Sequence, residues 1–161
     1  MSKYTMMILS KNIQNYMNTT QILKHETINN TKWYIVDAKE QNLGRLSTQI
    51  VSILQGKNSK LYTPHVNPMH YIVIINAKHI NLTGQKKYQK VYKRHSGRPG
   101  GLKITTFTEM YQKSPNKILE NSIKGMLPKT TLGKQLFRQL KIYSENNHPH
   151  IAQQPTNITF K

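Results

Sequence analysis

The stretch from Lys90 to Lys103, KVYKRHSGRPGGLK, concentrates residue types that can bind phosphate groups. Its lysines and arginines can neutralise phosphates, while Tyr92 and His95 can stack on bases or hydrogen-bond to them. Its glycines allow backbone N–H groups to approach a phosphate closely, and Pro99 stiffens the segment. Three alternatives follow: a catalytic phosphate-binding loop, a flexible basic tether, or a loop shaped to hold nucleic acid.

Nucleotide-binding enzymes carry motifs that this chain lacks. A P-loop needs G-x4-G-K-[ST], whereas Gly133 and Lys134 are followed by Gln135. A dinucleotide-binding turn needs three spaced glycines after the first strand, and the segment DAKEQNLGRLS offers only Gly44. The sequence therefore disfavours a catalytic loop.

Asp37 is the best single candidate for acid–base chemistry, because it ends the first expected strand, where sites of α/β sheets lie. We favour a simpler role, in which its carboxylate accepts hydrogen bonds from loop amides or an arginine. An α/β nucleotide-processing enzyme that uses the strand ends near Asp37 and Asn76 remains an alternative. No metal or cofactor is expected, because the chain has no cysteine and its seven histidines lack H-x3-H spacing on a helix.

The charge balance points to a polyanionic partner. The chain has 24 Lys and Arg against 6 Asp and Glu, a net charge of +18, and no acid between Glu40 and Glu109. Like charges repel one another in a compact domain, and a nucleic acid would relieve that repulsion. The longest N-terminal apolar run, MMIL, is too short for a membrane span, so no membrane partner is expected.

Two regions carry this charge on ordered elements. The Pro-Gly-Gly sequence after Arg98 specifies a shape that a flexible tether would not need, so we favour a shaped nucleic-acid contact there. The second region is the segment IKGMLPKTTLGKQLFRQLK. Its pattern predicts two short amphipathic helices, and basic residues such as Lys124 and Lys134 lie between their apolar positions.

The pattern of apolar residues predicts the elements that position these regions. Apolar runs at 33–36 and 71–77 predict buried strands, and helical spacing over 43–54 predicts a helix between them, so the chain opens as a βαβ unit. The alternation over 88–95 predicts an extended basic arm. Thr106 with Glu109 forms a capping box, Ser114 caps a helix that Pro128 ends, and Thr131 caps a last helix. The segment KIYSE then predicts a final strand.

The chain divides into three parts. We expect an N-terminal extension over 1–31 that orders on a partner, an α/β RNA-binding domain over 32–145, and an irregular C-terminal tail over 146–161.

Five segments resemble, in order, the bacterial-type family of large-subunit ribosomal protein thirteen. They are WYIVDAKEQNLGRLS, GKNSKLYTPHVNPMHYIVIINAKHINLTGQK, VYKRHSGRPGGLK, KGMLPKTTLGKQLFRQLKIY and HPHIAQQP. The resemblance runs from about Trp33 to Pro155, and HSGRPGG with HPHIAQQP is most similar to the plastid and cyanobacterial branch. One departure is HVNPMHYIVI in place of the family's usual HVDTGDYIIV, so that Asn67 and His70 replace acids and Met69 replaces a glycine.

The resemblance implies a three-layer α/β/α fold with a small parallel sheet, extended basic loops and terminal extensions. It also implies direct binding to large-subunit ribosomal RNA, a role in subunit assembly, and no catalytic activity. The loops over 57–65, 86–103 and 124–134 are those expected against RNA. With the charge pattern, it gives these predicted rRNA-binding residues: Arg45, Lys57, Lys60, His65, Lys86, Lys87, Lys90, Lys93, Arg94, His95, Arg98, Lys103, Lys124, Lys129, Lys134 and Arg138.

The leading prediction is therefore a structural constituent of the large ribosomal subunit that supports assembly and translation, with neighbouring large-subunit proteins as further partners. A free basic RNA-binding regulator is the main alternative. Abundant Asn, Ile and Lys, and a start without an Arg-rich transit signal, predict synthesis inside an organelle. We expect a plastid (chloroplast) ribosome, ahead of a mitochondrial or a bacterial cytoplasmic one.

Overall fold

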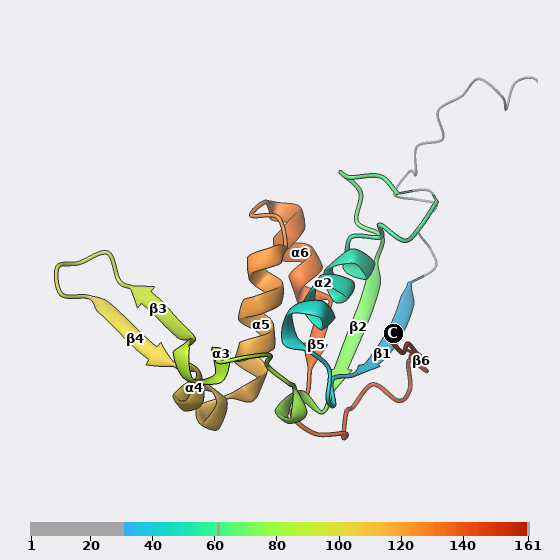
Figure 1. Ribbon diagram of the computed structural model, residues 1–161. Helices are drawn as coiled ribbons and strands as arrows, with labels where there is room; N and C mark the ends of the chain where they lie inside the picture. The colour runs from blue at the N-terminus through green and yellow to red at the C-terminus, as the bar shows by residue number, and fades with distance from the viewer. Residues whose placement is uncertain (1–30, 61, 161) are drawn as a thin grey trace, which may run out of the picture.

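The computed structural model describes residues 31–60 and 62–160. The predicted extension over 1–31 therefore lies outside the described residues, except for Thr31. The elements, in chain order, are β1 (Lys32–Asp37), α2 (Leu43–Leu54), β2 (His70–Ile75), the 3-10 helix η2 (Ala77–His79), α3 (Lys86–Gln89), β3 (Val91–His95), β4 (Leu102–Thr106), α4 (Phe107–Lys113), α5 (Pro115–Met126), α6 (Thr131–Arg138), β5 (Leu140–Ile142) and β6 (Thr156–Asn157) (Figure 1).

A parallel four-stranded sheet, in the order β5-β2-β1-β6, forms the centre of the molecule. The strands β1 and β2 pair from Lys32 opposite His70 to Asp37 opposite Ile75, with α2 connecting them. The predicted α/β class with a small parallel sheet and an opening βαβ unit is thus confirmed. The predicted domain boundaries at 32 and 145 stay a prediction.

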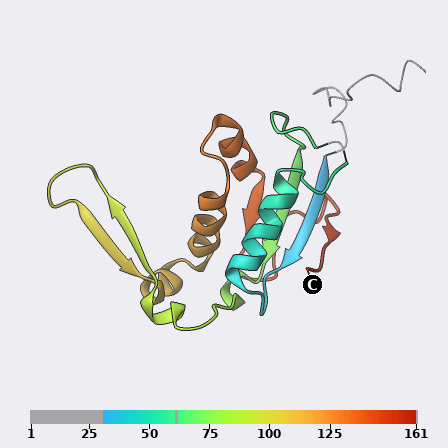
Figure 2. The ribbon, with the colours of Figure 1, turned by 45° about the horizontal axis from the view of Figure 1, so that its top comes forward.

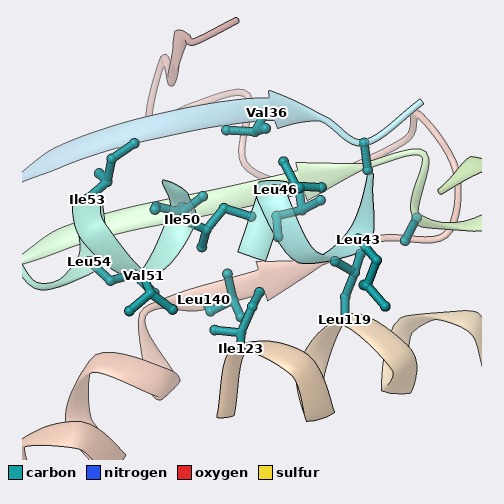
Figure 3. Close-up of a cluster of buried hydrophobic side chains, with 14 of the residues drawn as sticks. Val36, Leu43, Leu46, Ile50, Val51, Ile53, Leu54, Leu119, Ile123 and Leu140 are labelled. Carbon is teal, nitrogen blue, oxygen red and sulfur yellow. The ribbon is translucent and has the colours of Figure 1, made fainter. Parts of the chain in front are cut away.

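One face of the sheet is covered by α2 and α5, which also pack on each other. Side chains alternate between the two faces of a strand, so Ile72 and Ile74 share this face. Both are fully buried, as are Ile50 of α2 and Ile123 of α5. Figure 3 shows Leu119 and Ile123 of α5 directed toward the apolar side chains of α2.

The opposite face is contacted by the C-terminal segment. The ring of Trp33 stacks on Tyr71 at 4.5 Å and lies 5.2 Å from the ring of His150. Val73 points to the same face as Trp33 and Tyr71. It is fully buried, although it does not belong to the core cluster between the sheet and the helices. The resemblance predicted three layers, with the sheet between two outer layers. The helices α2 and α5 form one outer layer, and the C-terminal segment forms the other.

The tail differs from its prediction at two residues, because Thr156 and Asn157 form β6 instead of irregular structure. The strand β6 pairs in parallel with β1, and the backbone N–H of Ile158 donates to the carbonyl of Ile35 at 2.9 Å. The physical reason is the free edge of β1, whose N–H and C=O groups need partners. The polar composition of the tail gave no indication of this pairing.

The strands β3 and β4 form a separate antiparallel hairpin that projects away from the sheet on the side of α5 (Figures 1 and 2). The predicted extended arm over 88–95 is wrong at its start, because Lys86–Gln89 forms the helical turn α3. That turn closes locally, with the N–H of Lys90 donating to the carbonyl of Lys86. The remaining residues are extended, as predicted.

The helix starts follow the capping predictions, with two corrections. Thr106 and Glu109 form the predicted capping box at α4. Ser114 precedes α5, with Pro115 as its first residue, but its side chain makes no capping bond. The cap of α6 is Thr130 rather than Thr131, because the Thr130 hydroxyl accepts the hydrogen bond from the N–H of Gly133.

Candidate nucleic-acid interface

The tip of the β3–β4 hairpin has a defined shape. The N–H of Ser96 donates to the carbonyl of Gly101, and the N–H of Gly101 donates to the carbonyl of Arg98 at 3.0 Å. The second of these bonds closes a four-residue turn from Arg98 to Gly101. Pro99 and Gly100 are its two central residues, and Gly100 has a φ of 73°. Proline followed by a residue with positive φ is the pattern of a type II turn. The Pro-Gly-Gly sequence therefore fixes the direction in which Arg98 leaves the turn.

The imidazole of His95 takes part in this turn. Its Nδ1 accepts a hydrogen bond of 2.9 Å from the N–H of Gly97, whose φ is 87°. An accepting Nδ1 places the proton of the neutral ring on Nε2. The ring therefore presents a hydrogen-bond donor away from the backbone.

The register of the hairpin sorts its side chains onto two faces. Arg94 lies directly opposite Lys103, so two cations share one face. Directly opposed like charges destabilise a strand pair, and an anion between them would remove that penalty. On the other face, Lys93 pairs with Ile104 and His95 pairs with Leu102.

The basic residues before the hairpin lie on α3 and at its end. Lys86, Lys87 and Lys90 are exposed, and Nζ of Lys90 lies 5.5 Å from the centroid of the Tyr92 ring. The ring is half-buried, and burial raises the pKa of its hydroxyl. Lys90 is therefore held over Tyr92 by a cation–π contact at the base of the hairpin.

Four predicted residues surround one hollow between α5 and α6. Lys124, Lys129, Lys134 and Arg138 line this hollow of about 690 Å³. The start of α6 packs closely on the turn that follows α5, because a Cβ added at Gly133 would overlap the carbonyl oxygen of Pro128. The structure thus brings together cations that are 14 residues apart in sequence.

A second hollow, of about 530 Å³, joins the loop after α2 to α6. His65 and Arg138 both line it, so these two predicted residues are brought together. The buried Gln139 side chain also lines it and donates through Nε2 to Oδ1 of Asn67 at 3.0 Å. Met69 adopts a φ of 56°, the left-handed conformation that glycine takes without strain. Sequence reasoning missed Gln139, because one polar residue beside Leu136 and Leu140 carries no distinctive pattern.

The remaining predicted residues lie apart from these groups. Lys57 and Lys60 are exposed on the loop that precedes His65, and Arg45 is exposed on the first turn of α2. Figures 1 and 2 place the hairpin and the loop after α2 on different sides of α5. The predicted residues therefore form several basic regions rather than one continuous patch.

All sixteen predicted side chains are exposed, and none forms an ion pair with an acid of residues 31–60 or 62–160. Within those ranges, the recorded pair joins Nζ of Lys78 to Oε1 of Glu145 at 2.7 Å, outside the predicted set. Hydrogen bonding to Lys78, followed by its charge, lowers the pKa of the Glu145 carboxyl. The predicted cations are therefore available to an external anion.

The strand ends proposed for the alternative enzyme have a different arrangement. One carboxylate oxygen of Asp37 accepts hydrogen bonds from the backbone N–H of Lys39 and from the Asn76 side chain, each at 2.9 Å. This is the loop-acceptor role favoured for Asp37 from the sequence. In the described part of the chain, no three His, Cys, Asp or Glu side chains gather to hold a metal ion. No described helix combines the length and apolar character needed to cross a membrane.

Fold and surface together define a basic α/β protein whose exposed cations lie on a projecting hairpin and at a helix–helix turn. The chain belongs to the ribosomal protein L13 family, whose model matches residues 31–149. The resemblance to this family is therefore confirmed, and it is a family of ribosomal proteins rather than of enzymes.

Individual relatives agree with the family match. The chain is 59% identical over 144 residues to "Large ribosomal subunit protein uL13c" of Gracilaria tenuistipitata var. liui. This match covers 89% of this chain and 99% of the relative. It is 51% identical over 139 residues to the protein of the same name from Pyropia yezoensis, with coverages of 86% and 96%. It is 52% identical over 128 residues to "Large ribosomal subunit protein uL13" of Crocosphaera subtropica, with coverages of 80% and 85%. Red algal plastid and cyanobacterial relatives are those that the resemblance implied.

Proposed function

We propose that this chain is a structural constituent of the large subunit of a plastid ribosome, where it binds large-subunit ribosomal RNA. Membership of the L13 family supports the ribosomal role, and similarity to the uL13c proteins of two red algae supports the plastid location. The chain has no catalytic role in this proposal. Its partners are ribosomal RNA and neighbouring large-subunit proteins.

The observation that carries the RNA-binding role is the set of exposed cations without acidic partners among the described residues. Cations on ordered elements can replace the counterions of an RNA backbone, and binding then costs little conformational entropy because the chain is already ordered. Lysine outnumbers arginine in the chain, which suits contact with phosphates more than bidentate reading of bases. The hairpin adds Arg98 in the turn at its tip and Arg94 in β3, opposite Lys103.

Salt dependence of binding tests this role at the hairpin. Full-length protein is titrated with a transcript of plastid large-subunit ribosomal RNA at several salt concentrations. We expect Arg94→Glu combined with Arg98→Glu to weaken binding and to flatten the slope of log affinity against log salt by about 1 to 2. Each lost phosphate contact removes about 0.7 to 0.9 from that slope.

A charge-matched control separates local contact from net charge. Lys39→Glu combined with Lys117→Glu changes the net charge equally at exposed positions outside the predicted set. The control should keep most of the wild-type slope. If both double variants flatten the slope equally, the hairpin arginines do not contact the RNA.

A further inference from the structure

The β3–β4 hairpin exposes aliphatic side chains that the RNA-binding role leaves unused. Val91, Leu102 and Ile104 are 45%, 50% and 56% exposed. Large apolar side chains exposed together on one element mark an interaction surface more often than chance would give. Sequence reasoning assigned this segment to RNA through its cations and attached no role to these three residues.

The register places all three on one face of the hairpin. Side chains alternate across a strand, and the pairs Val91–Thr106, Lys93–Ile104 and His95–Leu102 share this face. We define the aliphatic face as these six residues. The opposite face carries Tyr92 with Thr105 and Arg94 with Lys103.

The two faces differ in chemistry. The face of Arg94 and Lys103 concentrates two cations, which suits phosphates. The aliphatic face has a row of Leu102 and Ile104 along β4, beside a row of Lys93 and His95 along β3. Bases stack on aromatic rings or on arginine planes, and Val91, Leu102 and Ile104 offer neither, so that His95 is the one ring on this face.

We propose that the aliphatic face docks a neighbouring protein of the large subunit, through a segment that carries apolar residues beside acidic ones. This proposal rests on the proposed ribosomal function and deepens it, by naming the surface and the chemistry of a partner. The apolar residues of the partner cover Leu102, Ile104 and Val91. Its carboxylates face Lys93 and the Nε2–H of His95, so these two residues bind protein rather than RNA.

The turn geometry supports this role of His95. The N–H of Gly97 donates to its Nδ1, which fixes the ring and leaves Nε2–H as the donor on the aliphatic face. Charge complementarity therefore selects an acidic segment. It excludes a second copy of this basic surface, whose lysines would face one another.

The aliphatic face is too small to hold a partner protein by itself. Stable independent interfaces bury about 1,200 to 2,000 Å² in total, more than one face of two five-residue strands can supply. The contact therefore forms when RNA already holds both proteins close together, which raises their effective concentration. The proposal accordingly has to be tested in assembled subunits.

Site-specific photocrosslinking distinguishes the two faces. The full chain, with p-benzoylphenylalanine at position 104 or at position 94, is assembled into large subunits and irradiated, and the adducts are identified by mass spectrometry and primer extension. We expect the probe at 104 to yield an adduct with one ribosomal protein, on a peptide containing Asp or Glu, and the probe at 94 to yield ribosomal RNA. An RNA adduct at 104, or no adduct there while the probe at 94 reacts, overturns the proposal.

A substitution pair gives an independent result. Val91→Thr with Ile104→Thr keeps β-branched residues while removing apolar surface. We expect its affinity for free ribosomal RNA to stay within twofold of the wild type, while its retention on salt-washed subunits falls at least threefold. Unchanged retention overturns the docking proposal. If the affinity for free RNA falls instead, the aliphatic face contacts RNA. That result also overturns the docking proposal, but it agrees with the proposed ribosomal function.

Discussion

The rings of His150 and Trp33 lie 5.2 Å apart, and this contact joins the C-terminal segment to the central sheet. Trp33 is stacked in turn on Tyr71, and Nε2 of His150 lies 2.8 Å from the hydroxyl of Tyr143. Burial lowers the pKa of His150 below its ordinary value of 6.5, and the positive charges of His148 and Lys141 lower it further. The folded state therefore favours the neutral ring.

This relationship predicts a loss of stability on acidification. The unfolded chain binds a proton at His150 near pH 6.5, whereas the folded chain binds it only at lower pH. The free energy of unfolding should thus be highest above pH 6.5 and fall as the pH drops below that value. His70 adds to the same trend, because burial, followed by the charge of Lys32, lowers its pKa. Urea denaturation at a series of pH values measures the trend.

Trp33 reports on the His150 contact directly, because it is the single tryptophan of the chain. We expect its fluorescence to change with pH in the folded protein as a cation forms beside the ring. In His150→Phe that change should disappear, and the pH dependence of unfolding should weaken. His95→Gln on the hairpin should keep the wild-type fluorescence profile. A pH response that persists in His150→Phe would show that another group causes it.

The turn at Gly100 predicts an effect of shape on RNA binding without any change of charge. A side chain at its φ of 73° is strained by about 1–2 kcal/mol, so Gly100→Ala should loosen the tip of the hairpin. We expect RNA affinity to fall by up to about tenfold. The salt slope should stay unchanged, because every cation remains.

Gly44→Ala is the matched control, because Gly44 is exposed on α2 and an added Cβ there meets no atom within 4 Å. It should leave RNA affinity as it is. Wild-type affinity in Gly100→Ala would mean that the turn conformation does not matter for binding.

The close approach at Gly133 predicts a loss of stability. An added Cβ would overlap the backbone carbonyl of Pro128, so α6 would have to move from the turn after α5. We expect Gly133→Ala to lower the free energy of unfolding by about 1–3 kcal/mol in urea denaturation. Gly125→Ala has open space around the new Cβ and should raise stability by up to about 1 kcal/mol. Equal stability of the two variants would contradict the tight packing of α6 on the turn after α5.

Local patterns in the sequence were enough to predict the βαβ unit and the capping box of Thr106 and Glu109. Apolar periodicity and short-range hydrogen bonding determine both, so neighbouring residues carry the information. The pairing of β6 with β1 depends instead on a free strand edge more than a hundred residues away. No local pattern around Thr156 indicates it.

The candidate site divides in the same way. Residue type, the absence of acids and the family resemblance predicted the sixteen candidate residues, and all of them are exposed, while their contact with RNA stays a prediction. The sorting of Arg94 and Lys93 onto opposite faces required the register of β3 against β4, which the sequence of one strand does not contain. The grouping of His65 with Arg138 at one hollow likewise arises from tertiary packing.

Sedimentation in high salt tests the central claim most directly. Tagged full-length chain expressed in its compartment is fractionated on a gradient, and the RNA that copurifies with it is sequenced. We predict that the chain migrates with large ribosomal subunits and that large-subunit ribosomal RNA is recovered with it. Migration as free protein, or recovery mainly of other RNAs, would contradict the account and favour a free RNA-binding regulator.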